Sequence, residues 1–126
     1  METSGKVPRR VLVVDDDPLV ADSIRRMLVF QGYRVETALS GAEALALFSE
    51  SGFDLTLLDY EMPKMKGDQL AAAIKNLVPN QPVVMFTGYG EAVQAADTQP
   101  QAVDALLGKP FDLQQLRQTL ARLLPD

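Results

Sequence analysis

The segment VLVVDDDP, residues 11–18, joins a run of four apolar residues to three aspartates and a proline. A short apolar run rich in β-branched residues is typical of a strand that is buried on both faces of a sheet. Asp17 followed by Pro18 is the pattern of a helix start, with the aspartate as N-cap and the proline at the first helical position. The segment therefore predicts a buried strand that leads through an acidic turn into a helix.

The same alternation continues along the chain. Further apolar runs predict strands at residues 35–38, 55–58, 83–86 and 105–107. Apolar residues at helical spacing predict helices with the faces Val20, Ile24, Met27 and Leu28; Leu45 and Phe48; Leu70, Ile74 and Leu77; and Leu113, Leu116, Leu120, Leu123 and Leu124. Ser40 with Glu43, and Asp112 with Gln115, have the spacing of capping boxes, which marks the start of two of these helices.

This alternation predicts the α/β class. We expect a doubly wound (βα)5 three-layer sandwich of flavodoxin-like type, with a parallel five-stranded sheet of order 2-1-3-4-5 and helices on both faces. The helix expected over residues 91–97 should be short or irregular, because Pro100 cannot lie inside a regular helix. Residues 1–9 are interpreted as an N-terminal extension and residues 10–126 as one domain.

The composition excludes several classes of protein. No apolar run approaches the roughly 20 residues of a membrane helix, and residues 1–10 lack the apolar centre of a signal peptide, so we expect no membrane span and a cytoplasmic location. A net charge of -5 argues against direct binding of nucleic acid. Because the chain has neither cysteine nor histidine, it forms no disulfides, and any metal must be held by oxygen ligands.

Polar side chains follow the predicted strands at the sheet edge where doubly wound proteins bind ligands. Asp15 and Asp16 follow the first strand, Asp59 the third and Thr87 the fourth, and Lys109 comes shortly after the fifth. Each of these residues alone is as well explained by a turn or a solvated surface position. However, the expected strand order makes the first and third strands neighbours, so the three aspartates should lie close together.

Three crowded carboxylates repel one another and destabilise the fold unless a cation neutralises them. Mg²⁺ is a hard cation that one or two carboxylates hold, and phosphate oxygens complete its coordination. The pattern therefore predicts a phosphoryl-transfer site, in which Asp59 attacks phosphorus while Thr87 and Lys109 hold the remaining oxygens. The product would be an acyl phosphate on Asp59.

Four segments of the chain resemble the response regulator receiver domain family: VLVVDDDP (residues 11–18), LTLLDYEMPKMKG (residues 55–67), VVMFTG (residues 83–88) and LLGKPF (residues 106–111). They occur in the family's order and cover nearly the whole chain. The resemblance implies that a phosphohistidine donor transfers its phosphoryl group to Asp59. It also implies that Mg²⁺ is bound by Asp15, Asp16, Asp59 and the backbone carbonyl of Glu61.

The resemblance has further implications for the switch and for partners. It implies that Thr87 is the switch hydroxyl and Lys109 the phosphate-binding lysine. Because the chain has no histidine of its own, the phosphoryl group must come from a sensor histidine kinase, a histidine phosphotransfer protein or a small phosphodonor. The resemblance leaves three arrangements open: a free-standing regulator, a regulator with a covalently linked output domain, and the end of a hybrid kinase. The domain itself is expected to be a signalling module rather than an enzyme, with only self-catalysed phosphotransfer and slow autodephosphorylation.

Three positions depart from the family pattern. Leu106 stands where an aromatic residue usually swings inward on activation, and Lys66 stands where an acidic residue is frequent. Pro100 interrupts a region that many relatives use for output. Signal transmission is therefore expected to differ from that of a standard aromatic switch.

Three other functions fit parts of the same pattern. Asp15 and Asp17 form a D-x-D motif, which suggests a haloacid-dehalogenase-like phosphatase with Asp15 as nucleophile, although only Asp112 and Asp126 remain after Lys109 to supply its further acidic motif. A flavin or nucleotide carrier would need a glycine-rich loop after the first strand, which is absent. A phosphate-independent interaction domain would not need the set of acidic, hydroxyl and lysine side chains.

Overall fold

The computed structural model describes residues 8–88, 102–108 and 111–124. Within them, five parallel strands form one sheet in the order β2-β1-β3-β4-β5, which confirms the predicted order. The strands are β1 (Arg10–Val14), β2 (Arg34–Ala38), β3 (Leu55–Asp59), β4 (Val83–Thr87) and β5 (Ala105–Gly108). Each observed strand begins or ends within a residue or two of the predicted apolar run.

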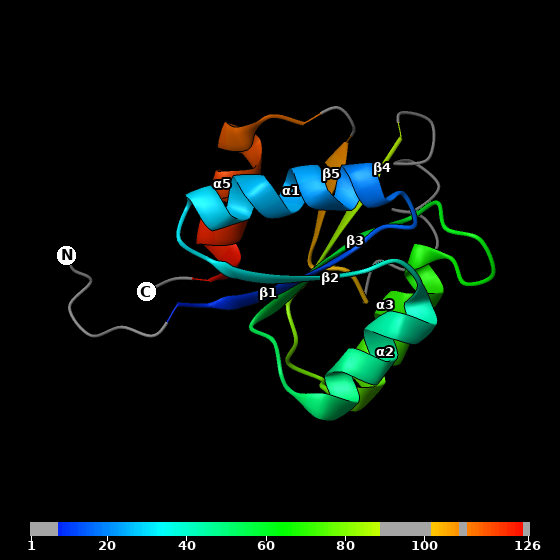
Figure 1. Ribbon diagram of the computed structural model, residues 1–126. Helices are drawn as coiled ribbons and strands as arrows, with labels where there is room; N and C mark the ends of the chain where they lie inside the picture. Colours follow the sequence, from blue (N-terminus) through cyan, green and yellow to red (C-terminus); the bar gives the residue numbers. More distant parts are fainter. Residues whose placement is uncertain (1–7, 89–101, 109–110, 125–126) are drawn as a thin grey trace.

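Helices cover both faces of this sheet, as Figure 1 shows. In the described part of the chain they are α1 (Pro18–Phe30), α2 (Gly41–Glu50), α3 (Gly67–Leu77) and α5 (Leu113–Leu123). Helices α1 and α5 lie on one face, and α2 and α3 lie on the other. The predicted doubly wound α/β class is therefore confirmed. The expected irregular helix at residues 91–97 and Pro100 lie outside the described residues.

The core is split by the sheet into two layers. Val11 and Val13 of β1 face the layer under α1 and α5, whereas Leu12 and Val14 face the layer under α2 and α3. All four are fully buried, because a parallel strand in the middle of this sheet has no solvent face. The sheet is thus a rigid platform, and its strand ends can hold polar groups in fixed positions.

The predicted N-caps are confirmed at three helices, namely at Asp17, Ser40 and Asp112. Asp112 and Gln115 form the full capping box, with reciprocal side-chain to backbone hydrogen bonds of 2.8 and 2.9 Å. Ser40 accepts from the N–H of Glu43 at 3.1 Å, but the Glu43 carboxylate accepts from the N–H of Leu39, the residue before the cap. The predicted reciprocal bond is therefore shifted by one residue.

The predicted apolar face of α3 is wrong at one position. Leu70 and Ile74 are fully buried, whereas Leu77 is 58% exposed. Leu77 is the last residue of the helix, so no further turn packs over it.

Among the described residues, no helix is long and apolar enough to span a bilayer.

Candidate functional site

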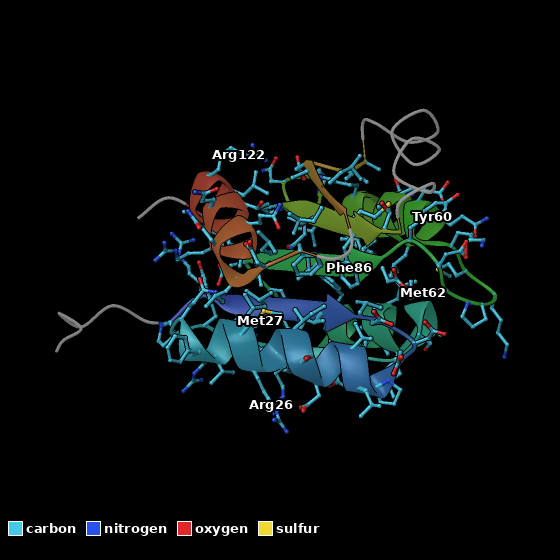
Figure 2. The ribbon with its side chains drawn as sticks, turned by 90° about the horizontal axis from the view of Figure 1, so that it is seen from above. Arg26, Met27, Tyr60, Met62, Phe86 and Arg122 are labelled. Atoms are coloured by element: carbon cyan, nitrogen blue, oxygen red, sulfur yellow. The ribbon has the colours of Figure 1, made fainter. Side chains whose placement is uncertain are left out.

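The carboxyl ends of β1, β3 and β4 lie side by side. The register pairs Val14 with Leu58 and Asp59 with Phe86. Asp15, the residue after β1, and Thr87, the last residue of β4, therefore lie on either side of Asp59. Figure 2 shows Tyr60 and Met62, which follow Asp59, at the end of the sheet toward which the β1 arrow points. This is the edge at which the sequence predicts the site.

Three carboxylates converge at this edge. Each of Asp15, Asp16 and Asp59 offers a carboxylate oxygen that lies within 4.8 Å of the others. Asp15 and Asp59 are buried, with 1% and 3% of their surface exposed, while Asp16 is exposed. The predicted convergence is therefore observed, and it combines two buried acidic groups with one that solvent reaches.

Asp15 is oriented by its own turn. Its Oδ1 accepts a hydrogen bond of 2.9 Å from the N–H of Asp17, the N-cap of α1. Asp17 in turn accepts from the N–H of Leu19 at 3.0 Å. The third aspartate of the motif thus caps the helix, as predicted, and its backbone holds the first aspartate in place.

The donor set of this cluster fits Mg²⁺. The ligands are hard carboxylate oxygens, and the exposure of Asp16 leaves room for the water molecules that Mg²⁺ keeps. Proteins usually supply most of the six to eight oxygen ligands of Ca²⁺ themselves, whereas Mg²⁺ keeps several waters and needs only a few carboxylates, as here. Softer metals prefer nitrogen or sulfur, and this chain has neither histidine nor cysteine.

Thr87 brings a buried hydroxyl to the same edge. The residue is fully buried, and its Oγ1 makes no hydrogen bond to any described residue. A buried hydroxyl in this state costs about 1–3 kcal/mol. An anionic oxygen bound beside Asp59 would give this hydroxyl an acceptor.

The loop after β3 folds back onto Asp59. The N–H of Gly67 donates to the carbonyl of Tyr60 at 3.0 Å. A Cβ atom added to Gly67 would lie 2.6 Å from the carbonyl oxygen of Asp59 and 2.7 Å from the Cα of Tyr60. Within the loop, between Tyr60 and Gly67, Lys64 has a left-handed backbone conformation with φ of 71°, which is uncommon for a residue other than glycine. The loop is therefore tightly closed against the predicted acceptor.

An ion pair in this loop was not predicted. Lys66 Nζ lies 3.0 Å from both carboxylate oxygens of Glu61 and 5.7 Å from the ring centroid of Tyr60. The sequence marked Lys66 as a departure from the family pattern but held no signal for its partner, because five residues in an irregular loop have no helical or strand periodicity.

Three other positions that the sequence analysis named have different outcomes. Lys109 lies outside the described residues. Leu106 lies in β5 opposite Met85 and is 39% exposed. The Glu61 side chain is exposed, and its backbone carbonyl stays a predicted metal ligand.

Comparisons with known proteins agree with this geometry. The family model for the response regulator receiver domain matches residues 11–121. The response regulator MprA from Mycobacterium sp. (strain KMS) is 36% identical over 124 residues, which are 95% of this chain and 54% of that protein. The transcriptional regulatory protein GlrR from Escherichia coli (strain K12) is 37% identical over 113 residues, which are 90% of this chain and 26% of that protein. The chain thus spans about half or less of the length of these relatives.

A solved structure shows the same likeness. The response regulator protein TrrA from Thermotoga maritima, solved in complex with Mg(2+)-BeF, superposes with a TM-score of 0.85 and 32% identity, over 92% of this chain and 99% of that one. The comparisons give no support to the phosphatase alternative. The sheet order, the acidic cluster and the family match lead to one conclusion: this chain belongs to the response regulator receiver domain family of two-component systems.

Proposed function

We propose that Asp59 is the residue of this receiver domain that accepts the phosphoryl group. The observation that carries the proposal is the position of Asp59, which ends β3 and lies within 4.8 Å, oxygen to oxygen, of Asp15 and Asp16. In the transfer, a carboxylate oxygen of Asp59 forms a bond to phosphorus as the bond between phosphorus and the donor's histidine nitrogen breaks. The histidine leaves with the electron pair of that bond, and Asp59 becomes an acyl phosphate.

Asp15, Asp16 and Asp59, together with the backbone carbonyl of Glu61, would hold Mg²⁺. When bound, the cation offsets the repulsion between the attacking carboxylate and the phosphoryl oxygens. Asp15 is suited to a fixed ligand role because the N–H of Asp17 orients it. Asp16 is exposed, so its carboxylate would meet the cation as it arrives from solvent.

Thr87 and Lys109 would hold the phosphoryl oxygens after transfer. The buried Thr87 hydroxyl lies one strand away from Asp59 and can donate to a phosphoryl oxygen there. The role of Lys109 rests on its place in the sequence after β5. Together the two residues would neutralise and orient the anion.

The partners follow from this chemistry. A sensor histidine kinase or a histidine phosphotransfer protein would supply the phosphoryl group, because this chain has no histidine. The relatives MprA and GlrR are longer regulators, which supports an output domain attached to this one. The receiver itself would catalyse only its own phosphorylation and slow dephosphorylation, in the cytoplasm.

A small phosphodonor tests the acceptor. We expect phosphoramidate with Mg²⁺ to add one phosphoryl group, seen by intact-protein mass spectrometry, and Asp59→Asn to abolish the addition. Omission of Mg²⁺ is the matched control, because it leaves the acceptor in place. A phosphoryl group that persists in Asp59→Asn but is lost in Asp15→Asn would contradict the assignment and indicate Asp15 as the nucleophile.

A further inference from the structure

The ion pair of Lys66 and Glu61 lies in the loop between β3 and α3, which folds back onto Asp59. The ammonium group of Lys66 contacts both Glu61 oxygens at 3.0 Å, and the two side chains are 47% and 46% exposed. The backbone of Lys66 is also hydrogen-bonded, because its N–H donates to the Gln69 side chain at 3.0 Å. The backbone of Lys66 is therefore fixed by a hydrogen bond, while both side chains of the pair are open to solvent.

Both members are close to the acceptor. Glu61 follows Asp59 by two residues, which span at most about 7 Å between Cα atoms. Lys66 immediately precedes Gly67, whose Cβ position lies 2.6 Å from the Asp59 carbonyl oxygen. Both charged side chains are therefore carried by residues whose backbone lies beside Asp59, and at low salt (about 0.01 M) the Debye length of roughly 30 Å covers the distance to the carboxylate cluster.

The negative charge of the acidic cluster has opposite effects on the two molecules that must bind there, Mg²⁺ and the phosphodonor. The cluster of Asp15, Asp16 and Asp59 attracts a divalent cation but repels a phosphodonor, which is an anion. A further unpaired carboxylate in the neighbouring loop would strengthen both effects. A lysine there weakens both, and a neutral pair leaves the field of the cluster as it is.

We propose that Lys66 is a positioning and charge-balancing residue that neutralises Glu61. It thereby lowers the affinity of the site for Mg²⁺ and speeds the reaction with the anionic phosphodonor. This inference rests on the proposed function of Asp59. Removal of the Lys66 charge makes the loop more negative, and removal of the Glu61 charge makes it more positive. The two changes should therefore shift Mg²⁺ affinity and phosphorylation rate in opposite directions, and removal of both charges should change them little.

The test is a double-mutant cycle with two measurements. Lys66→Met keeps a long apolar stem without charge, and Glu61→Gln keeps the shape of the side chain without charge. We expect Lys66→Met to bind Mg²⁺ about two- to fivefold more tightly, yet to react about two- to fivefold more slowly with acetyl phosphate at saturating Mg²⁺ and low salt. Glu61→Gln should shift both quantities the other way, and the double variant should return close to the unchanged protein.

A matched control exists at the other end of α3, whose N-cap is Lys66. Lys75 pairs with Asp104 at 2.9 Å at the opposite end of α3, so Lys75→Met removes a comparable pair far from the site. It should leave Mg²⁺ affinity and phosphorylation unchanged. At about 1 M salt, where the Debye length is about 3 Å, the effects of Lys66→Met should also largely disappear.

The possible results distinguish a failure of the role proposed for Lys66 from a failure of the function proposed for Asp59. If Lys66→Met weakens both Mg²⁺ binding and phosphorylation, Lys66 maintains the shape of the loop and the charge-balancing role is wrong. If neither quantity changes, the role is also wrong. If the unchanged protein accepts no phosphoryl group at all, the proposed function of Asp59 fails, and the sign of the change in Mg²⁺ affinity still tests the pair by itself.

Discussion

Gly67→Ala is the substitution that tests most directly how the loop supports Asp59. The added Cβ would meet the Asp59 carbonyl oxygen at 2.6 Å and the Tyr60 Cα at 2.7 Å, and both are backbone atoms that cannot rotate away. Ordinary contact begins at 3.4 Å, so the start of α3 and the end of β3 must separate by about 0.8 Å. β3 is hydrogen-bonded between β1 and β4, so we expect the loop and α3 to absorb most of this movement.

The expected cost follows from these contacts. Overpacking of this kind costs about 1–3 kcal/mol, more than alanine gains over glycine as a helix former. Unfolding entropy of about 2.1 cal/mol/K per residue, over 126 residues, converts this cost to a fall in Tm of about 4–11 °C. Because the displaced loop carries the carbonyl of Glu61, a predicted metal ligand beside Asp59, the rate of phosphorylation of Asp59 should fall by about ten- to a hundredfold.

Gly52→Ala is the matched control. A Cβ at Gly52 has nothing within 4 Å, and its backbone is not left-handed. Its unfolding free energy should stay unchanged or rise by up to about 1 kcal/mol, because alanine restricts the unfolded chain. Thermal and urea denaturation, together with the rate of phosphorylation by phosphoramidate, would measure both variants. A Gly67→Ala protein as stable and as reactive as Gly52→Ala would refute the close approach of the loop to Asp59.

Three further predictions concern the site and the switch. Asp16→Ala should weaken Mg²⁺ binding at least tenfold, measured by calorimetry or tyrosine fluorescence; an unchanged affinity would remove Asp16 from the ligand set. Thr87→Val should raise the unfolding free energy of the unphosphorylated protein by about 1 kcal/mol, because it removes a buried hydroxyl that makes no hydrogen bond to a described residue, and yet should weaken the response to phosphorylation. Beryllofluoride, a mimic of the phosphoryl group, should with Mg²⁺ change the amide exchange of residues 88–100 while Leu106 keeps its partial exposure. If Leu106 instead becomes buried and the exchange of that segment does not change, the leucine acts as the aromatic switch does.

Local signals in the sequence were sufficient for the elements of this fold. The apolar run before Asp15 predicts a buried strand because each of its residues needs an apolar environment whatever its neighbours are. Asp17, Ser40 and Asp112 predict helix starts because a cap is made within three or four residues of the chain. Even the meeting of Asp15, Asp16 and Asp59 could be predicted, because one rule of strand order places the ends of β1 and β3 side by side.

Only the tertiary structure decided the details that shape the site. The contact of Gly67 with Asp59, the pairing of Lys66 with Glu61 and the burial of the Thr87 hydroxyl all depend on how an irregular loop and three strand ends pack together. The same is true of Leu77, which follows the apolar period of α3 and is nevertheless exposed, because burial at a helix end depends on what lies beyond it. Periodicity and capping report interactions over a few residues, whereas these contacts depend on distances in space that no short segment encodes.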